Sequence, residues 1–544
     1  MKTAATLHAT TVETYLWWQR GIIYQVYPRS FMDSNGDGVG DLFGITSQLD
    51  YLRWLGVDAL WISPIYPSPM RDFGYDVADY TGIHPIFGTL EEFDRLLRDA
   101  HARQMKVILD FVPNHTSDQH PWFLHSRSSR ASSKREWYIW RDPGPDCGPP
   151  NNWLSCFGGS AWEYDQHTDQ FYYHAFLREQ PDLNWRNPEV VDTMLGVLRF
   201  WLERGVDGFR VDVLWHLIKD EDGPDNPINP SWCEGTDPYK ALIPVHTTDH
   251  PEVHGVVTRM RRVVDEYKER VLIGEIYLPI ERLVQYYGVD LTGVHLPFNF
   301  QLVLARWDAR EIARLIAEYE AALPEGGWPN WVLGNHDQHR IASRVGPAQA
   351  RVAAMLLLTL RGTPTLYYGD EIGMRDVEIP AEKVQDPVEK NLSGHGLGRD
   401  PERSPMQWNA EKNAGFTTGE PWLPVTADYL TSNVKSQRDD PGSMLSLYRQ
   451  LITMRRGEPA LEVGRFEPVT AEGDVLAYFR RGRQGESTFL IALNLGRVPH
   501  VLHCPGEACD GTIALSTYLD RSGEPVHGDV QLRADEGVII RLAD

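Results

Sequence analysis

The chain has 544 residues, of which 42% are hydrophobic and 24% are charged, and its formal net charge is −23. A single hydrophobic core rarely grows beyond roughly 300 residues, so this length predicts a soluble protein with more than one domain. The acidic excess argues against nucleic acid and anionic membranes as partners, because both would be repelled over most of the surface.

The N-terminal segment, MKTAATLHATTVETYLWWQRG, carries Thr, His and Glu where a signal peptide needs an unbroken apolar core. No later stretch of sequence is long and apolar enough to span a bilayer, so we expect a cytoplasmic protein. The five cysteines lack CxxC spacing, which argues against a zinc site. Cys504 and Cys509 could form a disulfide, but free thiols are expected in a reducing compartment.

Short strand-like runs alternate with longer amphipathic patterns along most of the chain. The predicted strands are Gly21–Pro28, Ala59–Pro64, Lys106–His115, Gly208–Val213, Arg270–Tyr277, Val294–Phe300, Asn330–Asp337 and Gly362–Gly373. Helical patterns between several of them cover Leu90–Arg103, Glu189–Arg204, Glu252–Glu269 and Asp308–Ala322. This alternation predicts an α/β fold, a (β/α)₈ TIM barrel of parallel strands.

Two regions depart from the alternation. After the third strand, roughly seventy residues are rich in Trp, Pro, Gly, Asn and Ser, which predicts a small inserted domain that borders the active-site face. From about Phe466, short alternating runs separated by glycine turns predict an antiparallel β domain. The predicted boundaries are 1–112 and 189–464 for the barrel, 113–188 for the inserted domain and 465–544 for the C-terminal domain.

Three predicted strands end in a carboxylate: Asp212 in GFRVDV, Glu275 in VLIGEIY and Asp337 in VLGNHD. Side chains at the carboxyl ends of barrel strands project toward the active-site face, so the three could converge on one substrate. Glycoside hydrolysis needs two such groups, one protonated and one ionised. A single carboxylate at a strand end is more often a helix cap or an ion-pair partner.

The chain resembles the α-amylase family of glycoside hydrolases, and within it the oligo-1,6-glucosidase and α-glucosidase branch, over nearly its whole length. The motifs that carry this resemblance, in the family's order, are DFVPNH (Asp110–His115), QPDLN (Gln180–Asn184), GFRVDV (Gly208–Val213), GEIY (Gly274–Tyr277), NHD (Asn335–Asp337) and PMQW (Pro405–Trp408). The resemblance implies an exo-acting retaining α-glucosidase of short α-1,4 or α-1,6 oligosaccharides, with transglucosylation as a secondary activity.

The resemblance implies catalytic roles for the three carboxylates. Asp212 would be the nucleophile, Glu275 the general acid/base, and Asp337 a carboxylate that binds sugar hydroxyls. A retaining mechanism requires the first two about 5 to 5.5 Å apart, one ionised and one protonated. Arg210 points to the same face as Asp212 and can keep that carboxylate ionised. The pKa of Glu275 must instead be raised, by burial and by neighbouring negative charge.

The resemblance also implies residues that contact the innermost sugar. His115 and His336 would donate to its hydroxyls, Tyr75 would support its apolar face, and Asp76 would accept hydroxyl hydrogens. Without the resemblance, the histidines are interpreted as core residues, and Tyr75 and Asp76 as a turn and a cap.

Two arginines and one valine bear on substrate preference. Arg399 and Arg403 both fit the position of an arginine that family members use near the innermost sugar, and Arg399 is preferred. Val213, directly after the nucleophile, resembles the residue of α-1,6-selective members, whereas α-1,4-selective relatives carry Ala or Thr. Because one pocket methyl shifts selectivity by only about 1 to 3 kcal/mol, mixed activity is expected.

The loop DSNGDGVGD places oxygen-bearing side chains at alternating positions, with glycines that let it curl. This spacing suits a hard cation, although the loop is not an EF-hand, and a plain polar turn is the alternative. The resemblance implies structural Ca²⁺ or Mg²⁺, remote from the chemistry. The predicted ligands are Asp33, Asn35, Asp37, Val39 and Asp41.

Two other functions stay open at this point. A glucosyl isomerase or transferase, such as a trehalose or sucrose isomerase, would use the same carboxylates. A non-enzymatic relative of the amino-acid-transporter heavy chains is disfavoured, because all three carboxylates are present. The expected partners are short α-glucosides, and the chain is predicted to be a monomer or homodimer.

Overall fold

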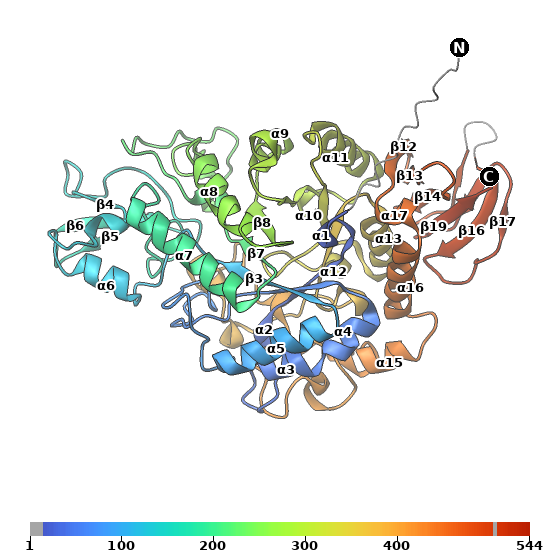
Figure 1. Cartoon of the computed structure of the whole chain (residues 1–544), viewed down its shortest axis with the longest axis horizontal. Helices are drawn as coiled ribbons and strands as arrows, with labels where there is room; N and C mark the ends of the chain where they lie inside the picture. The colour runs from blue at the N-terminus through green and yellow to red at the C-terminus, as the bar shows by residue number, and fades with distance from the viewer. Residues whose placement is uncertain (1–14, 504–508, 544) are drawn as a thin grey trace, which may run out of the picture.

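The computed structural model describes residues 15–503 and 509–543, and eight parallel strands lie at its centre (Figure 1). They form one sheet in the order β10-β11-β1-β2-β3-β7-β8-β9. Each strand lies within a predicted range, which confirms the barrel. Their bounds are β1 (Ile23–Val26), β2 (Ala59–Ile62), β3 (Lys106–Phe111), β7 (Gly208–Val211), β8 (Val271–Ile276), β9 (Leu296–Asn299), β10 (Asn330–Val332) and β11 (Thr363–Tyr367).

The side chain of Asn330 joins the two end strands of this sheet. The backbone N–H of Asn299 donates to Asn330 Oδ1 at 3.0 Å, and Asn330 Nδ2 donates to the carbonyl of Pro297. These bonds link β9 to β10, so a side chain closes the barrel at this point. Several strands are shorter than predicted, because the motif residues at their carboxyl ends belong to loops.

The helices between the strands cover the outside of the barrel (Figure 1). Helix α5 shows why they form: Thr89 and Glu92 exchange side-chain to backbone hydrogen bonds at its start, as in a capping box. Its buried residues Phe93, Leu96, Leu97 and Ala100 recur at helical spacing and face the barrel. The longer helices are α5 (Leu90–Ala102), α7 (Pro188–Arg204), α8 (Val253–Asp265), α11 (Ala309–Ala322), α13 (Pro347–Thr359) and α16 (Met444–Gly457).

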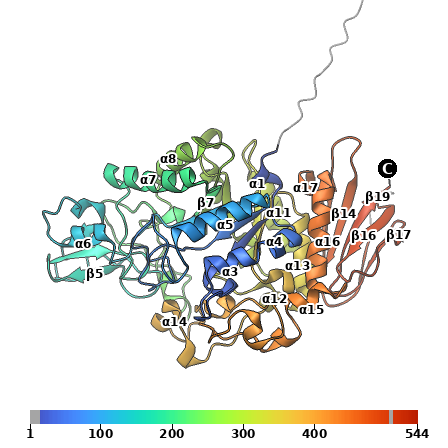
Figure 2. The same cartoon turned by 60° about the horizontal axis from the view of Figure 1, so that its bottom comes forward.

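A small antiparallel sheet lies in the region after β3 where a small inserted domain was predicted. It consists of β4 (Trp140–Arg141), β6 (Gln170–Tyr173) and β5 (Trp162–Asp165), in that order, and is preceded by α6 (Pro121–Arg127). A cluster of buried aromatic side chains that includes Trp153 packs on it. These elements project from one end of the barrel (Figure 2).

A second antiparallel sheet follows α16 at the opposite end (Figures 1 and 2). Its order is β12-β13-β14-β19-β16-β17, and a separate pair joins β15 and β18. The hydroxyls of Thr359 and Tyr478 lie 2.6 Å apart, which ties the sheet to α13. The strand bounds are β12 (Arg465–Glu472), β13 (Val475–Arg481), β14 (Thr488–Asn494), β15 (His500–Leu502), β16 (Gly511–Ser516), β17 (Pro525–Val526), β18 (Val530–Leu532) and β19 (Gly537–Leu542).

In the described part of the chain, none of the helices has the length and apolar character that crossing a membrane requires. Cys147, Cys156 and Cys233 are free thiols, as predicted. The prediction of a free thiol is wrong for Cys509, which is disulfide-bonded. Cys504 lies outside the described residues.

Candidate functional site

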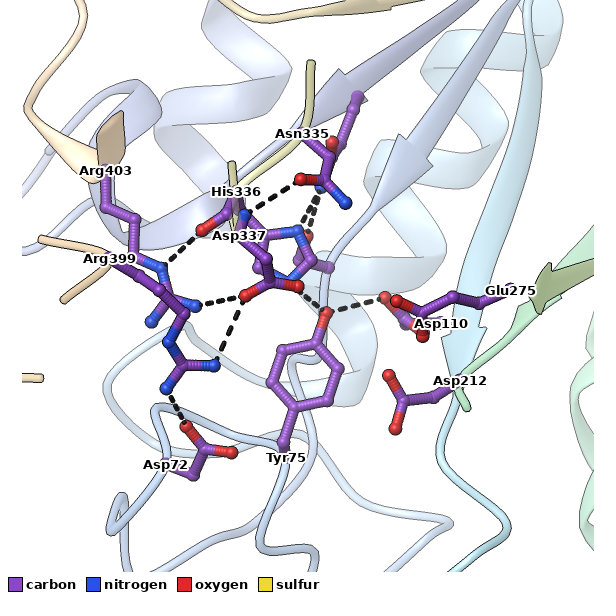
Figure 3. A network of polar contacts seen from close by, with 12 residues as sticks. Asp72, Tyr75, Asp110, Asp212, Glu275, Asn335, His336, Asp337, Arg399 and Arg403 are labelled. Atoms are coloured by element: carbon purple, nitrogen blue, oxygen red, sulfur yellow. Dashed lines mark hydrogen bonds and ion pairs between the residues drawn. The ribbon is translucent and has the colours of Figure 1, made fainter. Parts of the chain in front are cut away.

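The three predicted catalytic carboxylates come together at the carboxyl ends of the barrel strands (Figure 3). Glu275 is in β8, Asp212 directly follows β7, and Asp337 lies in the loop after β10. They line a cavity of about 330 Å³ that also receives side chains from the inserted region. The lining residues are Asp72, Tyr75, His115, Cys156, Phe157, Phe176, Asp212, Val213, Trp215, His216, Asp237, Tyr239, Glu275, Tyr277, Asp337, Gln338 and Arg399.

The fully buried guanidinium group of Arg210 contacts three carboxylates at this cavity. Nη1 of Arg210 donates to Asp212 Oδ1 at 2.7 Å and to Asp110 Oδ1 at 2.8 Å. Its Nη2 lies 2.7 Å from Glu275 Oε2. Because one planar cation contacts all three carboxylates, it fixes the separation of Asp212 and Glu275.

Burial raises the pKa of Asp212 well above its usual value, and Arg210 opposes that shift. Burial also raises the pKa of Glu275, which Arg210 and a hydrogen bond with Asp212 lower. Two buried carboxyls in such contact are costly to ionise together, which favours a proton on one of them. This is the state that an acid and a nucleophile acting together require.

Val213 adopts a left-handed conformation, with φ of 35°. A β-branched residue rarely does so, and the strain costs about 1 to 3 kcal/mol. In this conformation the backbone N–H of Val213 donates to Glu275 Oε2 at 2.9 Å. The turn after β7 therefore orients Glu275 as well as Asp212.

Asp337 accepts from two arginines through the same oxygen. Arg403 Nη2 lies 2.6 Å and Arg399 Nη1 3.2 Å from Asp337 Oδ1. Burial raises the pKa of Asp337, but the guanidinium groups of Arg403 and Arg399 help to lower it below its usual value. Asp337 therefore favours the ionised form, whereas burial raises the pKa of both Asp212 and Glu275.

The structure places the two arginines differently. Arg399 lines the cavity, with 11% of its side chain exposed, and it also donates to Asp72 at 2.8 Å. Arg403 is 1% exposed and donates to the carbonyl of His336, behind the cavity wall. Of the two, Arg399 is the arginine that a molecule in the cavity could contact.

A chain of hydrogen bonds supports the cavity from below. The side-chain amide of Gln25 donates to Nδ1 of His336 at 2.8 Å, so Nε2 carries the hydrogen that faces the Tyr75 hydroxyl at 2.6 Å. Tyr75 donates in turn to Asp110 at 3.0 Å, and Asp110 binds Arg210. Burial lowers the pKa of His336 well below its usual value, which keeps the ring neutral.

His115 lines the cavity, whereas Asp76 does not. Asp76 is fully buried and accepts hydrogen bonds from Ser68 and from the backbone N–H groups of Arg71 and Asp72. It organises its own loop, so the prediction that it binds sugar hydroxyls is corrected. Asp72, in the same loop, presents its carboxylate to the cavity instead.

Sequence reasoning missed several residues of the site. Asp110 opens the DFVPNH motif, and its position on β3 could have suggested contact with Arg210. No pattern distinguished Asp72 from Asp76. The aromatic side chains of Phe157, Phe176 and Tyr277 line the cavity but had no signal that separated them from core residues.

The predicted metal loop lies on the chain between α2 (Pro28–Phe31) and α3 (Leu42–Ser47). Asp33, Asn35 and Asp37 each accept a hydrogen bond from the backbone N–H two residues later. Asp41 accepts from Ser34 and from the backbone of Gly44, and caps α3. The donor set is oxygen only, which fits Ca²⁺ or Mg²⁺ in its chemistry.

Comparisons with known proteins extend over most of the chain. The family model described as alpha amylase, catalytic domain, matches residues 25–464. A probable alpha-glucosidase of Rhizobium meliloti (strain 1021) is 42% identical over 480 residues, which cover 85% of this chain and 87% of that protein.

Solved structures match both the barrel and the two flanking sheets. The alpha-glucosyl transfer enzyme XgtA superposes with a TM-score of 0.91 at 39% identity, over 97% of this chain and 100% of that one. The trehalulose synthase MutB from Pseudomonas mesoacidophila MX-45 superposes with a TM-score of 0.88 at 35% identity, also over 97% and 100%.

Proposed function

Since this chain belongs to the α-amylase family and is a glycoside hydrolase, we propose that it is an exo-acting, retaining α-glucosidase of short oligosaccharides. The observation that carries the proposal is the shared contact of Asp212 and Glu275 with Arg210, at 2.7 Å each. Two carboxyls that contact one guanidinium lie close together, which favours a retaining mechanism over an inverting one, since the latter places a water between them.

In the proposed reaction, Asp212 attacks the anomeric carbon while Glu275 gives its proton to the leaving oxygen. A covalent glucosyl-enzyme forms, and Glu275 then activates water to release α-glucose. Arg210 supports the ionised form of Asp212, and the N–H of Val213 orients Glu275. Asp337, held ionised by Arg399 and Arg403, would accept hydroxyl hydrogens of the distorted sugar.

The size and closure of the cavity support exo action. About 330 Å³ is small for a ligand pocket. Asp72 and Arg399 lie on the opposite side of Asp337 from Asp212 (Figure 3), and their 2.8 Å ion pair closes that end. A chain end could enter, but a longer glucan could not pass through.

The leaving-group side of the cavity is formed by Trp215, His216, Asp237 and Tyr239, which follow β7. A sugar held there would compete with water for the glucosyl-enzyme, so we propose transglucosylation as a secondary activity. The similarity to an alpha-glucosyl transfer enzyme supports this.

The experiment that tests the main proposal is product analysis by chromatography and anomeric NMR with maltose, isomaltose, sucrose and starch. Release of α-glucose from the disaccharides, with starch spared, is the expected result. β-Glucose as the first product would contradict retention, and rapid cleavage within starch would contradict exo action.

A sucrose isomerase is the second candidate, which the similarity to trehalulose synthase MutB favours. The same carboxylates would form the glucosyl-enzyme, and the released fructose would be the acceptor. Sucrose isomers as the main product of sucrose would favour this candidate, and free glucose with fructose would favour the hydrolase.

Linkage preference gives a first prediction. Val213→Ala should lower the ratio of kcat/KM for isomaltose to that for maltose about tenfold, because it removes two methyl groups beside Asp212 where the leaving sugar enters. The ratio is measured from glucose release under initial-rate conditions. Val289→Ala, at an exposed valine, is the control. A ratio within twofold of the wild-type value would contradict the role of Val213.

We also propose that Asp33, Asn35, Asp37, Asp41 and the carbonyl of Val39 bind structural Ca²⁺ or Mg²⁺. The loop contacts a distant segment, because the backbone N–H of Asp33 donates to the carbonyl of Phe416 at 3.0 Å. A bound ion would therefore stabilise the fold and take no part in catalysis.

Calcium at a hundredfold excess over its dissociation constant should add about 2.7 kcal/mol to stability. EDTA should lower the unfolding temperature, and Asp37→Asn should abolish the calcium effect on it, measured by scanning calorimetry. Asp222→Asn, at an exposed loop aspartate, should respond to calcium like the wild type. An unchanged calcium effect in Asp37→Asn would remove this loop as the site. The cytoplasmic location and the monomeric or homodimeric state stay predictions.

A further inference from the structure

A second group of titratable side chains, His339, Asp376 and Glu402, lies close to the active site but does not line its cavity. His339 follows Asp337 by two residues, Asp376 lies in the segment after β11, and Glu402 belongs to the short helix η8 (Pro401–Arg403). One ligand atom of each residue lies within 4.8 Å of the other two. Among the described residues, these are the three His, Cys, Asp or Glu side chains whose ligand atoms lie this close to one another.

The three side chains form a site that is open on one side and buried on the other. His339 Nδ1 lies 2.9 Å from Asp376 Oδ2 and 3.9 Å from Glu402 Oε2. The His339 side chain is 52% exposed, that of Asp376 17% and that of Glu402 only 2%. A small ion could therefore reach the group from the His339 side.

Glu402 Oε2 is buried and has no hydrogen-bond partner among the described residues. A buried carboxylate oxygen without a hydrogen bond is costly, so it calls for an explanation. The guanidinium of Arg403, the next residue, donates to Asp337 and to His336 instead. The atom without a hydrogen bond is the one that faces His339.

Other charges around the group leave its ligand atoms available. The backbone N–H of Arg340 donates to Asp376 Oδ1 at 2.9 Å, which leaves Oδ2 toward His339. The guanidinium of Arg340 donates to the carbonyl of Tyr368, and that of Arg344 to the carbonyls of His339, Val303 and Leu333. None of these guanidinium bonds reaches the carboxylates.

We propose that His339, Asp376 and Glu402 bind a divalent transition-metal ion of the Zn²⁺ type, with solvent completing its coordination. One imidazole nitrogen and two carboxylate oxygens suit such an ion, whereas Ca²⁺ and Mg²⁺ prefer oxygen alone. The ion would give Glu402 Oε2 the partner that it lacks. Small side-chain rotations would bring the three atoms to about 2.0 to 2.2 Å from a common centre.

A simple ion pair between protonated His339 and Asp376 is the competing explanation. It accounts for the 2.9 Å contact with Asp376, but it leaves Glu402 Oε2 at 3.9 Å from His339 Nδ1, without a hydrogen bond. The chain offers a matched control, since His503 Nδ1 also lies 2.9 Å from Asp529 Oδ2. That pair is exposed and belongs to no group of three such residues in the described chain.

Isothermal titration of the full-length, EDTA-treated protein with ZnCl₂ tests the proposal, in buffer that holds millimolar Ca²⁺ to saturate oxygen-only sites. We expect binding of a Zn²⁺ ion that H339Q and D376N each weaken at least about tenfold, and that H503Q leaves unchanged. E402Q should have the same effect as H339Q.

Absence of Zn²⁺ binding in the wild type would overturn the proposal, as would equal affinity in the wild type and H339Q. A loss of affinity in H503Q equal to that in H339Q would also overturn it. Because Glu402 is buried, E402Q is used only if its circular dichroism and unfolding temperature match the wild type. If they do not match, the proposal is tested with H339Q and D376N alone, because these residues are less buried.

Discussion

Asp212→Asn is expected to lower kcat/KM for an aryl α-glucoside by at least about 10⁴-fold, because the atom that would bond to the anomeric carbon is lost. Asn keeps the shape of Asp, and its side-chain oxygen can still accept the 2.7 Å hydrogen bond from Arg210. The circular dichroism spectrum and the unfolding temperature should therefore stay near those of the wild type. Asp222→Asn, outside the cavity, should keep full activity.

Azide can distinguish the nucleophile from the acid. With α-glucosyl fluoride, which needs no acid, azide should enter the space left in Asp212→Ala and give β-glucosyl azide by a single displacement. In Glu275→Ala, Asp212 would still form the covalent intermediate, and azide should give the α-anomer. NMR of the products identifies each anomer. An α-azide from Asp212→Ala would reverse the proposed roles.

Arg210→Met is expected to have the largest combined effect on stability and activity. It leaves Asp110, Asp212 and Glu275 buried without their shared cation, and removal of one partner from a buried ion pair typically costs about 3 to 5 kcal/mol. Activity should fall at least about 10³-fold, because Asp212 would be protonated at neutral pH. Glucose release and scanning calorimetry measure the two effects.

The loss of stability in Arg210→Met should depend on pH. Arg210 lowers the folded-state pKa of the three carboxyls, so without it these values rise further above those of the unfolded chain. When a carboxyl has a higher pKa in the folded state than in the unfolded chain, its contribution to stability is fully present below the unfolded-state pKa. This contribution is lost as the pH rises through the folded-state pKa. In the wild type, burial raises the pKa of Asp110 to about 6.

The loss of stability in Arg210→Met, relative to the wild type, should therefore be smallest near pH 4 to 5, where the carboxyls are protonated. It should grow toward pH 8. Arg199→Met is the control, because Arg199 makes two bonds with Glu266 on the surface. It should cost less than about 1 kcal/mol at any pH. If Arg210→Met lost the same stability at pH 5 and at pH 8, the electrostatic origin of that loss would be contradicted.

The barrel and the apolar runs that precede Asp212, Glu275 and Asp337 can be predicted from the sequence alone, although Asp337 lies in the loop beyond β10. These features are local: an apolar run followed by an acid is readable within a few residues, and α5 has both its capping residues and its buried stripe within its own length. The inserted and C-terminal sheets were likewise visible as changes in pattern.

Which side chains face the cavity depends instead on the tertiary structure. Asp72 and Asp76 lie in one loop, and Arg399 and Arg403 in one segment, and each pair looks alike in sequence. In the folded chain Asp72 and Arg399 line the cavity and lie 2.8 Å apart, whereas Asp76 and Arg403 do not line it. The contact between Asp110 and Arg210 likewise depends on β3 lying beside β7. Such pairings join residues far apart in the chain, so no local pattern contains them.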